Sequence, residues 1–436
     1  MLKPTFEGCW QIGGIRLNIE EYITTLTEQI RFKQARQGVA QEIRNHISDQ
    51  TQAYEQSGME HDKAVEMAVR EMGDPIEAGV ALDRVHRPQF DWRLFLMTVL
   101  FSLAGVFLMY VTGALGQNNG QLIRQCFFTF VGIGIVLLIY FADYTFVGKY
   151  ALPIYIAISI LFCVYRKTGI MVNAHIPALR SLVYLYVPVY AGILYRYRGK
   201  RLSSIIKSLF FIILTAFLSQ WFATSVFVGF SIGAICTFLL LYAVLKGWFE
   251  VNRKRIAAFI AITVVMLSAF VVYIAFFAYD YQRMRLLAFL EQNHYPEAAN
   301  FQLTLVRRAL ANAQIIGGNA ETILTKGLVQ NDTFLILTQS IAMYGIIVGI
   351  AITAAFVLLA YRALNIVKRQ KNPFGMMMSA ACFLLVFFNC TTGILMNFGL
   401  WPMGALQFPF LSVGGSATIM YAVIIGLLMS CRRRIA

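Results

Sequence analysis

The sequence predicts an all-α protein: a polytopic membrane body of about ten transmembrane helices, preceded by a small cytoplasmic helical bundle. Hydrophobic residues make up 58% of the chain, charged residues make up only 14%, and the mean hydropathy is +0.64. A helix that spans a bilayer needs roughly 20 mainly apolar residues, and the chain contains many such runs. This composition excludes an ordinary soluble enzyme.

The formal charge of +15 is divided unevenly along the chain. Residues 1–92 hold 15 acidic and 10 basic residues, whereas the remainder holds 7 acidic and 27 basic ones. The division predicts two domains, a soluble acidic one at 1–92 and a basic membrane domain at 93–436. No basic run alternates with aromatic residues on a soluble face, so we expect membrane lipids, and not nucleic acid, as partners.

Helix start signals organise the soluble domain. Asn18 followed by Glu21 fits a capping box, and Asp74 followed by Pro75 fits the start of a fourth helix. Four short helices are expected. The pattern across most of residues 19–86, with its Met-Gly-Asp-Pro turn, resembles the HAAS-type helical domain that precedes membrane modules in Gram-positive bacteria. This resemblance implies a regulatory or interaction role, and a passive cytoplasmic cap is the alternative.

Ten apolar runs are long enough to cross a membrane. Clusters of Lys and Arg follow the fourth, sixth, eighth and tenth runs, and the positive-inside rule places these clusters and both termini in the cytoplasm. The hydrophilic segment 280–332 then faces outside the cell. The predicted spans are 93–114, 122–142, 148–165, 179–195, 204–222, 224–246, 255–279, 333–362, 375–397 and 409–430.

Neither cysteine nor histidine suggests a metal site. The chain has seven cysteines, none in a CxxC pair, and five histidines scattered singly. No metal site and no disulfide framework are therefore expected.

The segment 280–332 concentrates charge that the rest of the membrane domain lacks. Five of the seven carboxylates beyond residue 92 lie in it, beside Arg283, Arg285, Arg307 and Arg308. Two interpretations fit this pattern. The segment is either a solvated loop with ordinary surface charges or the place where the protein performs its chemistry.

A turn rich in proline and glycine precedes the last predicted span. Proline and glycine free backbone groups, which must then be satisfied inside protein or in a wet cavity. Such breaks often mark binding sites, although a purely structural break is the alternative. The binding residues predicted here are Pro409, Ser412, Gly414, Gly415 and Ser416.

Together with Asn397, Pro402, Gly404 and Phe410, this turn resembles the SEDS family of cell-wall polymerases, the FtsW, RodA and SpoVE group. A second match begins at Tyr281, where Arg283 and Arg285 align with the start of the family's large outer loop. The resemblance covers roughly residues 93–430. It implies ten spans with a large outer loop between the seventh and eighth.

The resemblance also implies a function, that of a peptidoglycan glycosyltransferase which polymerises lipid II at the outer face of the cytoplasmic membrane, in division, elongation or sporulation. Asp332 matches the family's catalytic aspartate at the mouth of the eighth span, and a positioned carboxylate can take the proton of an attacking sugar hydroxyl. Arg283 and Arg285, with Arg307 and Arg308 as weaker candidates, would bind pyrophosphate.

The implied partners are lipid II and a class B penicillin-binding protein. No cofactor is firmly implied, although a divalent cation between Asp332 and phosphate is possible chemistry. The sequence Thr338-Gln339-Ser340 stands where the family usually has glutamates. A non-catalytic membrane scaffold or regulator is therefore one alternative, and a transporter of polyprenyl-linked sugar is another.

Overall fold

The computed structural model describes residues 18–86, 90–114, 119–169, 176–199, 202–249, 283–284, 287, 289–290, 301–318, 334–402, 408–412 and 414–433. The chain divides into two compact units, and it passes from the first to the second between Phe90 and Asp91. We call them the head unit and the membrane unit.

The head unit contains four helices, α1 (Ile19–Glu28), α2 (Lys33–Gln56), α3 (His61–Glu71) and α4 (Pro75–His86). Their apolar faces meet in one core, as helical spacing of apolar residues predicts. Fully buried side chains form its centre. These are Tyr22, Leu26, Ile30, Val39, Ile47 and Ala68.

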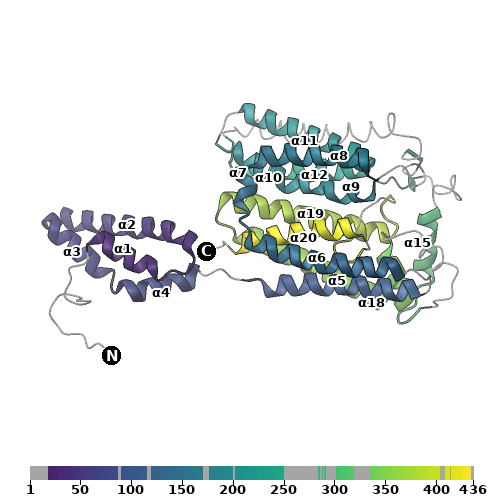
Figure 1. The fold of residues 1–436 in the computed structure, drawn as a ribbon, viewed down its shortest axis with the longest axis horizontal. Coiled ribbons are helices and arrows are strands. Elements are labelled where there is room, and N and C mark those ends of the chain that lie inside the picture. The colour runs from purple at the N-terminus through teal and green to yellow at the C-terminus, as the bar shows by residue number, and fades with distance from the viewer. Residues whose placement is uncertain are drawn as a thin grey trace. The chain divides into compact units, whose positions relative to one another are not determined.

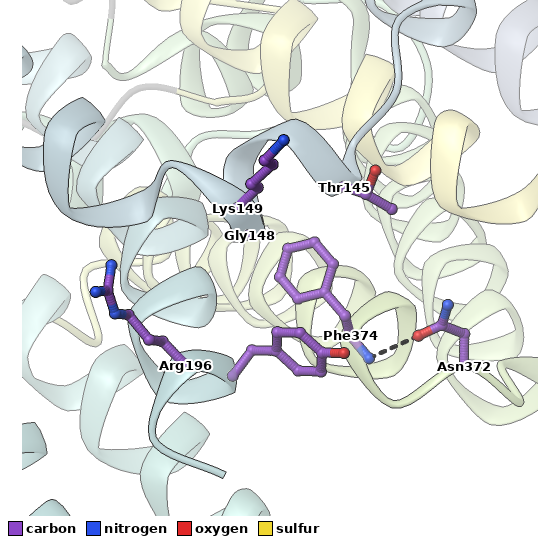
Figure 2. A pocket seen from close by; sticks show the side chains of 7 residues that line it. Thr145, Gly148, Lys149, Arg196, Asn372 and Phe374 are labelled. Atoms are coloured by element: carbon purple, nitrogen blue, oxygen red, sulfur yellow. Dashed lines mark hydrogen bonds between the residues drawn. The ribbon is translucent and has the colours of Figure 1, made fainter.

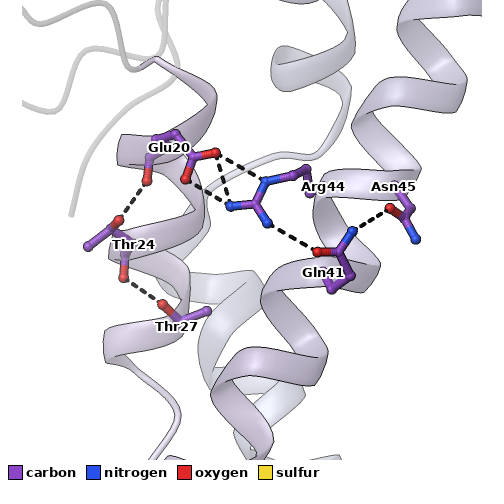
Figure 3. Close-up of polar contacts among 6 residues, drawn as sticks. All are labelled: Glu20, Thr24, Thr27, Gln41, Arg44 and Asn45. Carbon is purple, nitrogen blue, oxygen red and sulfur yellow. Dashed lines mark hydrogen bonds and ion pairs between the residues drawn. The ribbon is translucent and has the colours of Figure 1, made fainter.

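The predicted helix starts are confirmed. The Asn18 amide donates to Glu21 Oε2 at 3.1 Å, and Asp74 Oδ1 accepts from the Ile76 amide at 2.8 Å. Figure 3 shows Arg44 of α2 as a fork on Glu20 of α1, at 2.9 to 3.1 Å. The hydrogen bond and charge of Arg44 lower the pKa of Glu20; the Glu20 side chain is exposed and that of Arg44 is half-buried.

The membrane unit is also entirely helical within the described residues, which confirms the predicted fold class. Nine of its helical segments are long and apolar enough to cross a membrane, and the predicted span 255–279 lies outside the described residues. In Figure 1 these helices run side by side, with α7 at one end and α15 at the other. The elements are α5 (Trp92–Ala114), α6 (Asn119–Phe141), α7 (Thr145–Lys149), α8 (Ala151–Thr168), α9 (Pro177–Leu182), η1 (Val183–Leu185), α10 (Tyr186–Arg196), α11 (Leu202–Ala223), α12 (Val226–Leu245), α15 (Phe301–Ala311), α17 (Ile336–Tyr344), α18 (Ile346–Arg369), α19 (Pro373–Asn397) and α20 (Gly415–Arg432).

Two predicted span boundaries are wrong. The run 333–362 was expected to be a single helix, but it is broken at Gly345 into the short α17 and the long α18. The last span begins at Gly415, not at residue 409, because the chain turns at Phe408–Ser412 before α20 starts. In both places glycine or proline interrupts a hydrophobic run, and hydropathy does not register such breaks.

Burial separates inner helices from outer ones. In the spans Pro177–Arg196 and Gly415–Arg432, 72% of the most apolar window is buried, and in α12 and α19 the share is 61%. The same share is 39% or less in α5, α6, α8, α11 and α18. The inner helices therefore form the core, and the outer helices present apolar side chains to lipid.

Contacts between distant residues define one end of the bundle, which we call the terminal face. Asp91 at the start of α5 pairs with Arg432 at the end of α20. Gln370 Nε2 donates to the Cys431 carbonyl at 2.7 Å, and Ser430 Oγ donates to the Ala142 carbonyl at 2.8 Å. The starts of α5 and α19 and the ends of α6, α18 and α20 therefore share this face.

The opposite end, the loop face, contains α15, the start of α17 and the end of α19. Val306 and Ala309 of α15 pack against Leu335 and Met396 in one apolar cluster. The loop face is the end at which the predicted catalytic segment enters α17.

Candidate active site at the loop face

The structure describes only part of the predicted site. Asp332 and Arg285 lie outside the described residues, whereas Arg283 is described, helical and exposed. The described residues continue at Phe334, two residues after Asp332. The described part of the site therefore consists of the residues that hold Phe334 and the start of α17 in place.

Asn397 is the centre of that arrangement. Its side chain is fully buried at the end of α19. Its Oδ1 accepts from the Thr338 amide and from Thr338 Oγ1, both at 3.0 Å. Its Nδ2 donates to the Phe334 carbonyl at 3.0 Å and to the Gly393 carbonyl at 2.9 Å.

Thr338 Oγ1 also donates to the Asn397 carbonyl at 2.8 Å. One amide thus joins the Phe334 backbone to the first turn of α17. Asn397 belongs to the motif that resembles the SEDS family, but the sequence alone indicates no role for it. An amide ending a 25-residue apolar helix was the available signal.

The proline-glycine turn packs closely against α5 and α19. Ser412 Oγ accepts from the Phe408 amide at 2.8 Å, so the predicted binding residue Ser412 closes the turn with its hydroxyl. Pro409 and Ser412 are both buried, and Phe410 has a φ of 60°, which is uncommon outside glycine. At Gly105 of α5 a side chain is excluded, because a Cβ would lie 2.7 Å from the Phe410 carbonyl oxygen.

The start of α20 is held by α6. Gln125, a buried residue that the sequence did not single out, accepts from the Gly414 amide at 3.1 Å through Oε1. Its Nε2 donates to Thr418 Oγ1 at 3.4 Å. A Cβ on Gly415 would lie 2.3 Å from the Phe128 ring, so this position requires glycine. Ser416 is half-buried beside it.

Residues 314–317, which follow α15, are hydrogen-bonded to the backbone around the break at Gly345. The Ile346 amide donates to the Gln314 carbonyl at 2.9 Å, and the Gly317 amide donates to the Tyr344 carbonyl at 3.0 Å. Backbone groups freed by a helix break inside a membrane must find such partners. Residues 301–318 of the 280–332 segment are thus bound to the bundle, through the apolar cluster of α15 and these backbone hydrogen bonds.

Arg307 and Arg308 lie on this fastened helix. Arg307 Nη2 donates to the Gly399 carbonyl at 3.3 Å, and Arg308 is exposed. In the described part of the membrane unit, the carboxylates Asp91 and Asp143 both lie towards the terminal face. The described part of the loop face is therefore cationic, and it would attract a phosphorylated ligand.

The divalent cation stays a prediction from sequence. Within the described residues no group of three His, Cys, Asp or Glu side chains could hold a metal ion, and Asp332 is not among those residues. No step of a reaction is therefore assigned to a metal.

Comparison with known proteins identifies the family. The profile of the FtsW/RodA/SpoVE family, described as "Cell cycle protein", matches residues 179–435, which is more than half of the chain. The chain belongs to this family. The predicted SEDS membership is thereby confirmed, and the protein is a multi-pass membrane protein of a bacterial family.

Relatives in the family carry names of one activity. Peptidoglycan glycosyltransferase MrdB of Escherichia coli (strain K12) is 28% identical over 178 residues, which cover 39% of this chain and 47% of that protein. Probable peptidoglycan glycosyltransferase FtsW of Geobacter metallireducens is 29% identical over 157 residues, covering 36% and 42%. The matched segment thus spans less than half the length of these relatives.

Solved structures resemble the chain over a greater length. The rod shape determining protein RodA of Thermus thermophilus aligns with a TM-score of 0.55 and 13% identity, over 79% of this chain and 97% of that one. One chain of a solved peptidoglycan synthase complex, described as coordinating polymerization and crosslinking, aligns with a TM-score of 0.60 and 15% identity. The alignment covers 79% of this chain and 98% of that one. At this identity the likeness concerns the fold alone.

Proposed function

We propose that this SEDS-family protein is a peptidoglycan glycosyltransferase that polymerises lipid II at the outer face of the cytoplasmic membrane. The observation that supports the proposal is the Asn397 network, which holds the backbone at Phe334, two residues after Asp332 in the sequence, on a cationic face. The names of the relatives in the family support the same reaction.

In the proposed reaction, Asp332 accepts the proton of an acceptor sugar hydroxyl as the oxygen attacks the anomeric carbon of the donor. The new glycosidic bond forms while the bond from the anomeric carbon to the phosphate oxygen breaks. Undecaprenyl pyrophosphate leaves with the bonding electrons. A single carboxylate that acts as base fits inversion at the anomeric carbon.

Arginines stabilise the departing pyrophosphate in this proposal. Guanidinium groups donate paired hydrogen bonds that match phosphate oxygens. Arg307 and Arg308 are on α15, which the apolar cluster holds against α17 and α19. Arg283 and Arg285 precede them in the same outer segment.

We further propose that both termini are cytoplasmic. Arg196, Lys368 and Arg369 end helices that reach the terminal face, and basic residues concentrate on the cytoplasmic side of membrane proteins. The partner proposed at the outer face is a class B penicillin-binding protein, because the similar solved chain belongs to a complex titled for polymerization and crosslinking.

The test is polymerisation of purified lipid II by the full-length protein, with glycan products separated on a gel. Asp332→Asn removes the base with little change of shape, and we expect the polymer to disappear. Asp143→Asn is the matched control, because Asp143 lies at the opposite face and its Oδ1 accepts from the Thr145 amide, a bond that asparagine can also accept.

Polymer formation by the Asp332→Asn protein at the parent rate would refute the assigned base. If the parent protein forms no polymer, alone or with a class B penicillin-binding protein, the scaffold and transporter alternatives replace the enzyme.

A further inference from the structure

The terminal face contains a cavity that the proposed reaction does not use. It has a volume of about 480 Å³ and lies where α7, the end of α10 and the start of α19 meet (Figure 2). Its lining residues are Thr145, Gly148, Lys149, Tyr195, Arg196, Asn372 and Phe374.

The floor of the cavity is aromatic and closely packed. Phe374 is buried, and its ring lies 4.9 Å from the Tyr195 ring and 5.6 Å from the Tyr144 ring, measured between centroids. A Cβ on Gly148 would lie 2.7 Å from the Phe374 ring, so glycine permits this close approach. The cavity therefore has a defined apolar wall.

The rim of the cavity is polar and cationic. Lys149 and Arg196 come from different helices, and neither forms an ion pair among the described residues. Figure 2 shows Arg196 and Asn372 on opposite sides of Phe374. Asp143 is close in sequence to Thr145 and Lys149, but it lines a separate apolar cavity, and its Oδ1 accepts from the Thr145 amide.

We propose that this cavity binds the phosphate group of an anionic phospholipid from the leaflet at the terminal face. The ammonium group of Lys149 and the guanidinium group of Arg196 are each suited to phosphate oxygens. The aromatic floor suits the glycerol and the first acyl carbons, which free phosphate lacks. Basic residues at the cytoplasmic surface are attracted to anionic lipids, and the proposal does not depend on the glycosyltransferase reaction.

The experiment measures lipid retention by the full-length protein in a neutral detergent, using native mass spectrometry. The probes are phosphatidylglycerol and phosphatidylcholine with the same acyl chains. We expect retention of phosphatidylglycerol over phosphatidylcholine. The double variant Lys149→Gln/Arg196→Gln should bind phosphatidylglycerol roughly tenfold more weakly, because it removes the charge-assisted hydrogen bonds that the two rim cations would make to the phosphate group.

Two variants separate a site from general surface charge. Lys368→Gln/Arg369→Gln removes the same charge from exposed positions on the terminal face that do not line the cavity, and it should leave phosphatidylglycerol binding unchanged. The charge-preserving Lys149→Arg/Arg196→Lys should also retain binding. If the double glutamine variant fails to fold by gel filtration, Arg196→Gln alone is judged by the same criterion.

An equal loss in the Lys368→Gln/Arg369→Gln variant would overturn the proposal, because only diffuse charge would then be at work. No preference between the two lipids would overturn it as well. Displacement of phosphatidylglycerol by inorganic phosphate alone would assign the cavity to a soluble phosphate compound instead.

Discussion

At the scale of single residues, buried amides organise the membrane unit. Asn397 and Gln125 each join segments that lie far apart in the sequence. Asn397 is 59 residues from its partner Thr338, and Gln125 is 289 residues from its partner Gly414. Both side chains are almost fully buried. Asn397 hydrogen-bonds backbone groups of Phe334, Thr338 and Gly393, and Gln125 accepts from the Gly414 amide, so each satisfies buried backbone groups. These two residues therefore set the positions of the loop-face segments.

Replacing Asn397 by alanine should destabilise the protein and reduce polymerisation together. The change leaves the Thr338 amide and the Phe334 carbonyl without their partner, at a cost of about 1–3 kcal/mol for each buried group. The melting temperature in detergent and the rate of lipid II polymerisation measure the two effects.

Asn389→Ala is the control for this change, because Asn389 lies on the same helix and donates one hydrogen bond, to Tyr421 Oη at 3.1 Å. It should lower the melting temperature while leaving more activity. Equal activity losses at equal destabilisation would mean that Asn397 acts through stability alone.

Tyr22 gives the head unit a defined dependence on alkaline pH. Burial, with a smaller contribution from Asp74, raises the pKa of Tyr22 from 10.0 to about 12, and its hydroxyl donates to the Met72 carbonyl at 3.1 Å. Because the folded pKa is raised, its stabilising contribution is complete below pH 10 and is lost as pH rises through about 12.

The measurement is tyrosinate absorbance of the full-length protein and of Tyr22→Phe between these pH values. The difference between the two titrations isolates Tyr22, and it should have its midpoint well above 10.0. A midpoint at the ordinary value would show that the hydroxyl is not buried in solution.

At the scale of elements, glycine decides where helices break. Gly345 has a φ of 98°, and a Cβ there would lie 2.7 Å from the Ile315 carbonyl oxygen. The break lets the segment Gln314–Gly317 bind between α17 and α18 through backbone hydrogen bonds. The result is the short helix α17 at the loop face, with residues 314–317 hydrogen-bonded to its end.

Gly345→Ala should therefore loosen the outer segment. A left-handed φ and the steric conflict together cost about 1–3 kcal/mol, and hydrogen exchange should increase at the amides of Gly317 and Ile346. The readout is exchange followed by mass spectrometry of peptides from 301–318 and 334–350.

Gly134→Ala is the matched control, because Gly134 is an exposed position within α6 where a Cβ would meet nothing within 4 Å. It should leave exchange at the loop face unchanged. Unchanged exchange in both variants would contradict the role given to Gly345.

At the scale of the whole molecule, the first and last helices of the membrane unit are tied together. The Asp91 side chain is 3% exposed, and its Oδ2 lies 2.9 Å from Arg432 Nη1 in an ion pair that lacks hydrogen-bond geometry. Asp91 Oδ1 accepts from the Leu94 amide at 3.1 Å, which caps α5. The start of α5 is thus held against the end of α20.

Asp91→Asn should destabilise the membrane unit by about 1–3 kcal/mol, between the values for exposed and fully buried ion pairs, because it keeps the cap but leaves the partly buried Arg432 without its counter-charge. Denaturant titration in micelles measures the free energy of unfolding. A double-mutant cycle with Arg432→Gln isolates the pair. A coupling energy near zero would mean that the ion pair contributes nothing to holding the two helices together.

Several features of this protein follow from the sequence alone: the all-α class, the head helices, the turn before α20 and the described spans apart from the break at Gly345 and the start of α20. They could be predicted because hydropathy, helical spacing and capping signals such as Asn18 with Glu21 are local in the sequence. The role of Asp332 stays a prediction, since it rests on resemblance and falls outside the described residues.

Only the tertiary structure decided how distant residues meet. The Asn397 network, the hold of Gln125 on Gly414, the break at Gly345 and the basic cavity around Phe374 each bring together residues from separate helices. No local pattern encodes these contacts, because an apolar helix gives no sign of which buried amide or glycine will face which neighbour until the helices pack.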